Sequence, residues 1–231
     1  MKKVLTVAVQ GDAANLSSEF EEVEIIQADD PKLNKCKSKY TVFLSSGFTY
    51  GEMRPLLDRA ESASADILTF EGGCLFKTSL IKHPDTDTNI FSLQISCILN
   101  CKSIERTDVV PFKLSEVIDC DGGALEKLKN TVREYIYAKT KVPVDVYSYA
   151  RDLICERLVL VYKSYMLAIR NGADNNLLVE FDRSIKSYDM VLYKVFENRF
   201  NHAELEKLRA KNFKISFITA IKYKKELKIK Q

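Results

Sequence analysis

Residues 39–70 read KYTVFLSSGFTYGEMRPLLDRAESASADILTF, and this stretch decides the fold class. It contains two short apolar runs, Thr41–Leu44 and Asp66–Phe70, which have the length and composition of buried strands. Between these runs, apolar residues recur at helical spacing with charged residues opposite, which predicts an amphipathic helix over Tyr50–Ser64. Two buried strands joined by a helix are typical of a parallel α/β unit. We therefore expect an α/β fold with a mainly parallel sheet.

The neighbouring sequence extends this pattern on both sides. Lys3–Val9 and Val23–Gln27 are predicted to be strands that precede the segment. Asn89–Leu99 has the spacing of a helix that packs over a sheet. Ser103–Phe112 is predicted to be a further strand, and Pro111 favours an edge position for it because proline cannot donate a ladder hydrogen bond.

From Asp119 onward the pattern becomes almost entirely helical. Asn171-Gly172 is a helix stop signal, and Asp174 and Asp189 are suited to cap the helices that follow. We thus expect an α/β domain over residues 1–118 and a helical region over 119–231 packed on it. The predicted helices are Leu125–Tyr137, Val146–Arg170, Asn176–Tyr188, Met190–Phe200 and Ala203–Ile229.

The composition excludes several classes of protein. The 231 residues are 46% hydrophobic and 29% charged, which is ordinary for a globular chain and excludes disorder or a disulfide scaffold. A net charge of +3, from 35 basic and 32 acidic residues, is too balanced to indicate nucleic-acid binding. The chain has two histidines and no glycine-rich nucleotide motif, which disfavours histidine-based metal chemistry and a phosphate-binding loop.

The N-terminus and the cysteines indicate the cellular compartment. The first apolar run ends at Val9, too short for a signal peptide or a membrane span, so we expect a cytoplasmic chain. The six cysteines have no Cys-x-x-Cys spacing and are predicted to be free thiols. Cys97 and Cys101 are four residues apart, which favours the buried face of a helix over the alternative of a zinc site.

The positive charge is concentrated in the last 21 residues. Lys211–Gln231 has seven lysines and one glutamate, a sum of +6, whereas residues 1–210, with 28 basic and 31 acidic groups, sum to −3. As a helix, this segment would align Phe213, Phe217 and Ile221 beside lysines, as in helices that lie on anionic membranes. The alternative is a last helix packed on the body with a solvated lysine face. The residues of the predicted peripheral contact are Lys211, Phe213, Lys214, Phe217, Ile221, Lys222 and Lys225.

Polar residues follow two of the predicted strands. Asp29 and Asp30 come after Val23–Gln27, and Ser45, Ser46 and Gly47 end the strand that begins near Thr41. Ligands of open parallel sheets bind at the carboxyl ends of strands, so these residues are candidates to line one crevice. The alternative for the aspartates is a solvated turn before a proline.

The order of these segments resembles family 2 glycosyltransferases with the GT-A fold. In that family one strand ends in Val-Asp-Asp-Gly-Ser, a later one ends in Phe-Leu-Asp-Ser-Asp-Asp, and a helix then leads to Ala-Asp-Ile-Val. The corresponding stretches here are IIQADD (25–30), FLSSGF (43–48) and ADIL (65–68), and the likeness continues through GCLFKTSLI (73–81), DTNIF (87–91) and VVPF (109–112).

The resemblance implies a nucleotide-sugar crevice formed by Asp29, Asp30, Ser45, Ser46 and Gly47. Ser45 and Gly47 stand where the family has metal-binding carboxylates, and neutral groups are poor ligands for Mg²⁺ or Mn²⁺. We therefore expect no resident cofactor and no such metal, with a nucleotide sugar as the implied ligand.

Two further departures concern the acid and the connections. Where the family has Glu-Asp, this chain has Asp87-Thr88, so Asp87 is the candidate catalytic acid in a displaced position. About a dozen residues separate Asp30 from Phe43, where the family has a longer helix–strand–helix stretch. Part of the nucleotide cradle is thus predicted to be missing.

Three hypotheses follow from these residues. The first is a catalytically degenerate glycosyltransferase-like protein of bacterial type that acts in surface-glycan assembly, with another glycosyltransferase or a second copy of itself as partner. The second is an active glycosyltransferase that stabilises its leaving group without a metal, through a basic side chain. The third is an unrelated α/β protein.

Overall fold

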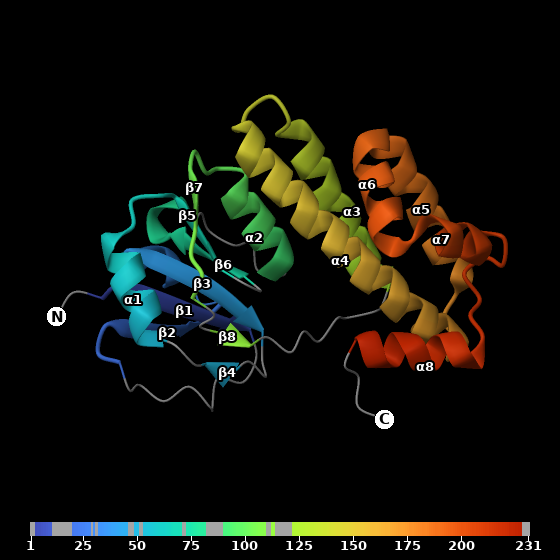
Figure 1. The fold of residues 1–231 in the computed structure, drawn as a ribbon, viewed down its shortest axis with the longest axis horizontal. Coiled ribbons are helices and arrows are strands. Elements are labelled where there is room, and N and C mark those ends of the chain that lie inside the picture. Colours follow the sequence, from blue (N-terminus) through green and yellow to red (C-terminus); the bar gives the residue numbers. More distant parts are fainter. Residues whose placement is uncertain are drawn as a thin grey trace. The chain divides into compact units, whose positions relative to one another are not determined.

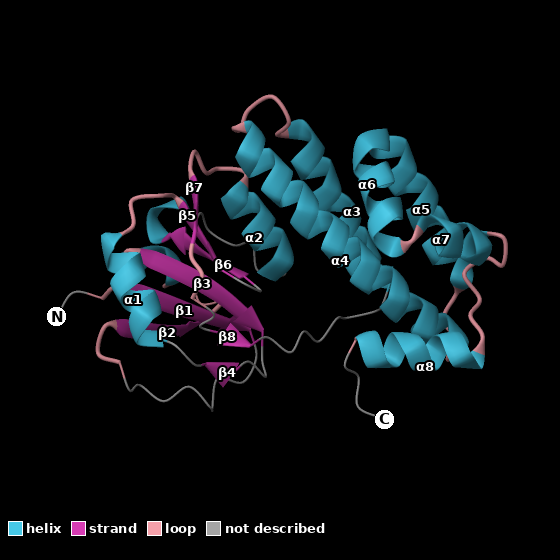
Figure 2. Ribbon diagram, viewed as in Figure 1, coloured by secondary structure: helices cyan, strands magenta, loops and turns pink. Residues whose placement is uncertain are grey.

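The computed structural model describes residues 3–10, 20–28, 30, 32–45, 49–50, 53–70, 73–81, 90–109, 112–113 and 122–227. The chain forms two compact units. The first comprises Met1–Val117 with Lys141–Tyr147, and the second comprises Ile118–Thr140 with Ser148–Gln231. Of the described residues, the first unit contains the strands, two complete α-helices and the first turn of a third, and the second unit is helical (Figures 1 and 2).

A six-stranded sheet forms the centre of the α/β unit, in the order β2-β1-β3-β6-β5-β7. Neighbours pair in parallel except at β3–β6 and β5–β6, so β6 alone among these six strands runs opposite to the others. The expectation of an α/β fold with a mainly parallel sheet and a largely helical C-terminal region is confirmed. The strands are β1 (Leu5–Gln10), β2 (Val23–Gln27), β3 (Tyr40–Ser45), β5 (Ile67–Phe70), β6 (Gly73–Lys77) and β7 (Ile104–Arg106).

The centre of this sheet is buried because apolar side chains continue along β1 without alternation. Val7, Ala8 and Val9 are each fully buried, as expected of a parallel strand covered on both faces. Helix α1 (Met53–Ser62) places Met53, Leu56, Leu57 and Ala60 in the core cluster that includes Val7 and Val42. Helix α2 (Ile90–Ile98) lies against β3, where the Gln94 amide donates to the Phe43 carbonyl at 3.4 Å.

A group of hydroxyls lies buried at the amino-terminal side of this sheet. Ser38 Oγ is 2.6 Å from Thr6 Oγ1 and 3.0 Å from Thr78 Oγ1, and it donates to the Tyr40 carbonyl at 3.0 Å. Thr78 Oγ1 is also 2.9 Å from Thr41 Oγ1. These neutral groups satisfy one another, and they join β1, β3 and the short 3₁₀ helix η2 (Thr78–Leu80) that follows β6.

Two predicted elements of the α/β unit differ in the structure. The predicted strand Ser103–Phe112 is two short strands, since β7 ends at Arg106 and β8 (Phe112–Lys113) pairs with β4 (Thr49–Tyr50) in a separate two-stranded sheet. β7 lies at a sheet edge, as predicted. Sequence patterns did not predict β6, which begins at Gly73 opposite Phe70, where a Cβ atom would lie 2.9 Å from the Phe70 ring.

The second unit is built from helices whose ends carry the predicted signals. Asp174 accepts from Asn176 N–H, Asp189 accepts from Val191 and Leu192 N–H, and Gly172 adopts φ +103 after α4. Its helices are α3 (Gly122–Tyr137), α4 (Val144–Arg170, of which the residues up to Tyr147 belong to the first unit), α5 (Asn175–Tyr188), α6 (Met190–Phe200), α7 (His202–Arg209) and α8 (Phe217–Glu226).

The prediction of one long helix over Ala203–Ile229 is wrong. The chain breaks after α7, where Asn212 and Phe213 adopt φ angles of 48° and 60° in the left-handed region. Phe213 is 1% exposed, and its ring centroid lies 5.8 Å from that of Tyr162 in the helical core. Phe213 is therefore a core residue rather than part of a surface stripe.

Candidate functional site

The carboxyl edge of β2, β1 and β3 is the place where the topology of the sheet reverses. The chain passes from β1 to β2 on one side and then returns past β1 to β3 on the other. Open α/β sheets bind ligands at such a switch point, outside the carboxyl ends of the strands. In the register of this edge, Val9 pairs with both Gln27 and Leu44, and Gln10 pairs with Ser45.

The structure brings two of the predicted site residues to this edge. Asp30 follows the end of β2 by three residues, and Ser45 is the last residue of β3, so they flank the carboxyl end of β1 from opposite sides. Of Ser45 only the backbone is described. Asp29, Ser46, Gly47 and Asp87 lie outside the described residues.

The carboxylate of Asp30 has a local partner. Its Oδ1 accepts from the Lys32 backbone N–H at 2.7 Å, and its carbonyl accepts from Leu33 N–H at 2.9 Å, at the start of the 3₁₀ helix η1 (Leu33–Lys35). Asp30 thus stabilises the turn that follows β2, which is the alternative considered for it from the sequence, a turn before a proline. Its position at the edge is compatible with a ligand contact as well.

Asp66, from the ADIL stretch that carried part of the family resemblance, has a structural role. Its Oδ1 accepts from Lys77 Nζ at 2.8 Å, and its Oδ2 accepts from the Lys102 backbone N–H at 2.9 Å. Partial burial by itself raises the pKa of the Asp66 carboxyl, but these two hydrogen bonds outweigh it and lower the pKa. The residue ties the start of β5 to the end of β6 and to the segment before β7.

The thiols at the end of α2 are buried. Cys97 and Cys101 are 2% and 1% exposed, and Cys101 Sγ donates to the Cys97 carbonyl at 3.1 Å. Burial raises the pKa of Cys97 to about 12, with a small contribution from Cys74, so the thiol stays protonated at neutral pH. Cys97 lies on the buried face of α2 as predicted, whereas Cys101 is buried beyond the end of this helix at Ile98, so the prediction of a helical pair is wrong for Cys101.

A buried charge network in the helical unit was missed by sequence reasoning. Asp182 Oδ1 accepts from the hydroxyls of Tyr162 and Tyr193, both at 2.8 Å, and Arg209 Nε donates to Asp182 Oδ2 at 3.0 Å. Asp182 is 7% exposed. Burial, followed by the negative charge of Asp182, raises the pKa of both tyrosines. The available signal was a charged residue on the apolar face of α5 formed by Leu178, Phe181 and Ile185.

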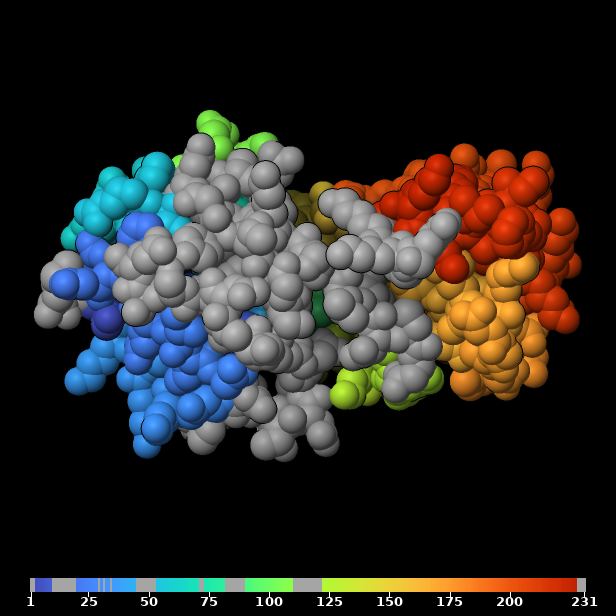
Figure 3. Space-filling model, turned by 90° about the horizontal axis from the view of Figure 1, so that it is seen from below, coloured from blue at the N-terminus to red at the C-terminus, as the bar shows by residue number. Residues whose placement is uncertain are grey.

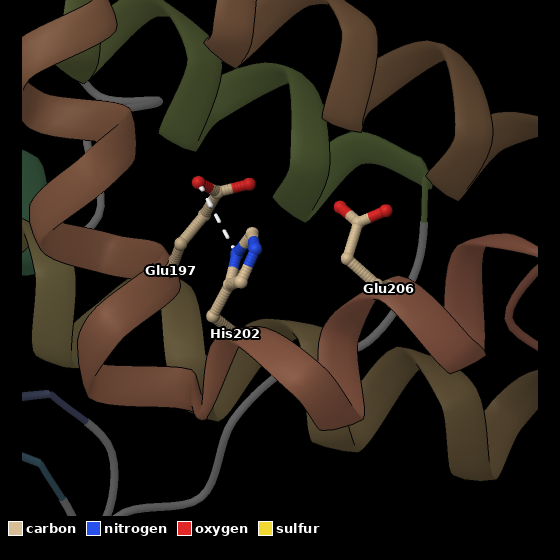
Figure 4. Close-up of side chains that lie close together, drawn as sticks. All are labelled: Glu197, His202 and Glu206. Carbon is tan, nitrogen blue, oxygen red and sulfur yellow. Dashed lines mark ion pairs between the residues drawn. The ribbon is translucent and has the colours of Figure 1, made fainter.

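Next to this network lies a group with the side chains of a metal site, Glu197, His202 and Glu206 (Figure 4). One ligand atom from each lies within 4.8 Å of the others, and His202 Nδ1 is 3.6 Å from Glu197 Oε2. Arg209, however, forms ion pairs with both glutamates, at 2.8 Å to Glu197 Oε1. A cation would have to displace this guanidinium, so the donor set does not indicate a metal centre.

The residues predicted to contact a membrane divide between two environments. Phe217, Lys211, Lys214, Lys222 and Lys225 are exposed, whereas Ile221 is half-buried and Phe213 is in the core. In the part of the chain that the structure describes, every helix is too short or too polar to cross a membrane. A membrane contact through the exposed residues of this set would be a contact with the membrane surface.

Comparison with known proteins adds no relative to this description. No protein-family model matches the chain, and no curated protein matches its sequence. The fold and the contacts of its own residues are the basis for assigning a function.

Proposed function

We propose that the chain is a glycosyltransferase-like protein of GT-A type, catalytically degenerate, that acts as a binding or assembly partner in surface-glycan synthesis. The support is an open, mainly parallel sheet with a switch point at β1 and with Asp30 and Ser45 at the strand ends beside it. The resemblance implies that a nucleotide sugar binds at this edge of the sheet.

The observation that carries the proposal is Ser45 at the carboxyl end of β3, paired with Gln10 beside the switch point. In the family that this chain resembles, carboxylates at this strand end hold the divalent metal that neutralises the leaving diphosphate. A hydroxyl has no charge and is a weak ligand for Mg²⁺ or Mn²⁺. The proposal is thus that the chain binds a nucleotide sugar but does not turn it over.

Calorimetric titration of the full chain with several nucleotide sugars, each with and without Mn²⁺, tests this proposal. We expect no heat that depends on Mn²⁺ for the native chain and no hydrolysis or transfer of the sugar. A double variant, Ser45→Asp with Gly47→Asp, places two carboxylates in the motif and is expected to gain Mn²⁺ binding. Asp58→Asn on the exposed face of α1 is the matched control, expected to bind as the native chain does.

The other hypotheses predict different outcomes in the same experiment. Turnover of a donor without metal would favour a metal-independent transferase and contradict degeneracy. Mn²⁺-dependent binding by the native chain would contradict the argument from Ser45. If neither the native chain nor the double variant bound any nucleotide sugar, the unrelated α/β protein would be favoured.

The partner is tested separately. Sedimentation velocity of the purified chain over a range of concentrations distinguishes self-association from a monomer. A monomer at all concentrations would leave a different glycosyltransferase as the proposed partner, whereas a dimer would favour a second copy of this chain.

A further inference from the structure

Helix α8 is fixed to the helical unit by one side. Ala220 and Tyr223 are 4% and 0% exposed, and the Tyr223 hydroxyl donates to Glu204 Oε1 at 2.9 Å. Lys163 Nζ lies 5.6 Å from the Tyr223 ring centroid and pairs with Glu226 at 2.6 Å. Figure 1 shows α8 lying across the C-terminal part of α4. The helix therefore has a fixed outward side.

The outward side combines large apolar side chains with lysines. Phe217 and Ile218 are 64% and 79% exposed, although Ser216, whose Oγ accepts from Thr219 N–H, fixes the helix start beside them. Figure 3 shows the C-terminal residues, in red, at the molecular surface. We define the α8 face as the exposed Phe217 and Ile218, the half-buried Ile221, and the exposed Lys211, Lys214, Lys222 and Lys225.

The charge on this face is mostly uncompensated. Lys222 pairs with Glu204 at 3.1 Å, whereas Lys211, Lys214 and Lys225 have no ion pair with any residue that the structure describes. The guanidinium of Arg170 lies 5.4 Å from the Phe217 ring centroid and adds a further positive charge. The nearby acid Glu226 pairs with Lys163 at 2.6 Å and, more distantly at 3.9 Å, with Lys222 of the face. The result is an exposed apolar pair that has Arg170 beside Phe217 and lysines both on the same helix and in the segment before it.

We infer that the α8 face binds the surface of a membrane that contains anionic lipids. An aromatic and an aliphatic side chain enter the boundary between headgroups and acyl chains, and the surrounding lysines attract the anionic headgroups. A nucleic acid would compensate the lysines but would leave Ile218 without an apolar environment, whereas the membrane surface provides both. This inference is independent of the proposed function, since it rests on another unit of the chain.

The first test uses fluorescence, because the chain has no tryptophan. Phe217→Trp provides a single reporter on the α8 face. Val191→Trp is the matched control, since Val191 is 60% exposed at the start of α6 in the same unit. On addition of vesicles of phosphatidylcholine and phosphatidylglycerol, we expect the emission of the first variant to shift to shorter wavelength and that of the control to stay unchanged.

The second test is co-sedimentation with the same vesicles and with vesicles of phosphatidylcholine alone. The native chain is expected to bind the anionic vesicles at least tenfold more tightly. Phe217→Ser with Ile218→Ser should lower that affinity about tenfold, whereas Met190→Ser with Val191→Ser, at similarly exposed positions, should not change it. Thermal melting should be unchanged in both variants because the altered side chains are exposed.

A charge variant completes the test. Lys211, Lys214 and Lys225 changed to Gln should weaken binding and reduce its salt dependence. The same change at exposed lysines elsewhere on the unit, Lys127, Lys194 and Lys207, gives equal net charge and should have less effect.

Equal binding to neutral and anionic vesicles, or no binding to either, would overturn the inference. The inference would also be overturned if the emission of Phe217→Trp did not shift with vesicles but shifted with heparin. That result would indicate that the α8 face binds a polyanion in solution. Loss of binding on charge removal with no effect of the apolar double variant would likewise contradict insertion of Phe217 and Ile218.

Discussion

The two units of this chain differ in how they accommodate polar groups in their interiors. The α/β unit buries neutral hydroxyls, with Ser38 and Thr78 at the centre of a group that satisfies itself. The helical unit buries an ion pair, Asp182 with Arg209, and surrounds it with tyrosine hydroxyls. Neutral groups cost little to bury once hydrogen-bonded, whereas a buried charge becomes very costly if its partner is lost. The units should therefore respond differently to comparable substitutions.

The largest effect is expected at the ion pair. Arg209→Leu removes the cation and leaves Asp182 and Glu197 without their charged partner in a buried site, which should cost about 3–5 kcal/mol of unfolding free energy. Urea denaturation followed by far-UV circular dichroism measures this loss. The control is Arg199→Leu, whose ion pairs with Glu156 and Asp152 are more exposed and should change stability by about 1 kcal/mol or less. Equal losses in the two variants would contradict the comparison between a buried and a surface pair.

A smaller effect is expected in the hydroxyl group. Ser38→Ala removes the Oγ that lies between Thr6 and Thr78, so the hydroxyls of Thr6 and Thr78 each lose a partner, at a cost of about 1–2 kcal/mol. Urea denaturation again provides the measurement, with Ser62→Ala on the exposed end of α1 as the control, expected to be close to neutral. If Ser38→Ala lost as much stability as Arg209→Leu, breaking a buried network of neutral hydroxyls would be as costly as breaking a buried ion pair, and the comparison would fail.

The smallest effect concerns the dependence of stability on pH. Because the folded pKa of Asp66 is below its unfolded value, the carboxylate adds stability above the unfolded pKa, about 3.9. That contribution disappears as the pH falls through the folded pKa. Asp66→Asn should therefore cost about 1 kcal/mol or less at pH 7 and flatten the decline of stability as the pH falls below the unfolded pKa of about 3.9. Asp58→Asn, at an exposed pair with Arg54, is the control. If the decline of stability at low pH were the same in Asp66→Asn as in the native chain, Asp66 would not contribute to it.

Local signals in the sequence were sufficient for many elements. Val23–Gln27 and Met190–Phe200 have the same bounds in the structure as in the prediction, because an apolar run or a capping aspartate marks where each begins. β6 was missed because its pairing depends on contacts with β3 and β5, which local periodicity does not contain. The break at Asn212 and Phe213 was missed for a related reason, since burial of Phe213 stabilises a backbone conformation that phenylalanine rarely adopts.

The candidate site was predictable in position only. The carboxyl ends of parallel strands share one edge of a sheet, so the expectation of a mainly parallel sheet predicted that Asp30, which follows one strand, and Ser45, which ends another, lie at the same edge. The hydrogen bond from Lys32 N–H to Asp30 depends on the turn geometry, and the pairing of Arg209 with Asp182 joins residues 27 positions apart. Neither contact has a local pattern by which it could be recognised.

The sheet is weakly paired where the reversed strand β6 meets β3. β1 and β3 share six register pairs, but β3 and β6 share only two, Tyr40 with Lys77 and Thr41 with Phe76. Insertions or deletions in the connections of β2, β1 and β3 are thus expected to have little effect on the register of β5 and β7. The two register pairs between β3 and β6 form a seam between the half of the sheet that contains the switch point and the half that contains β5 and β7.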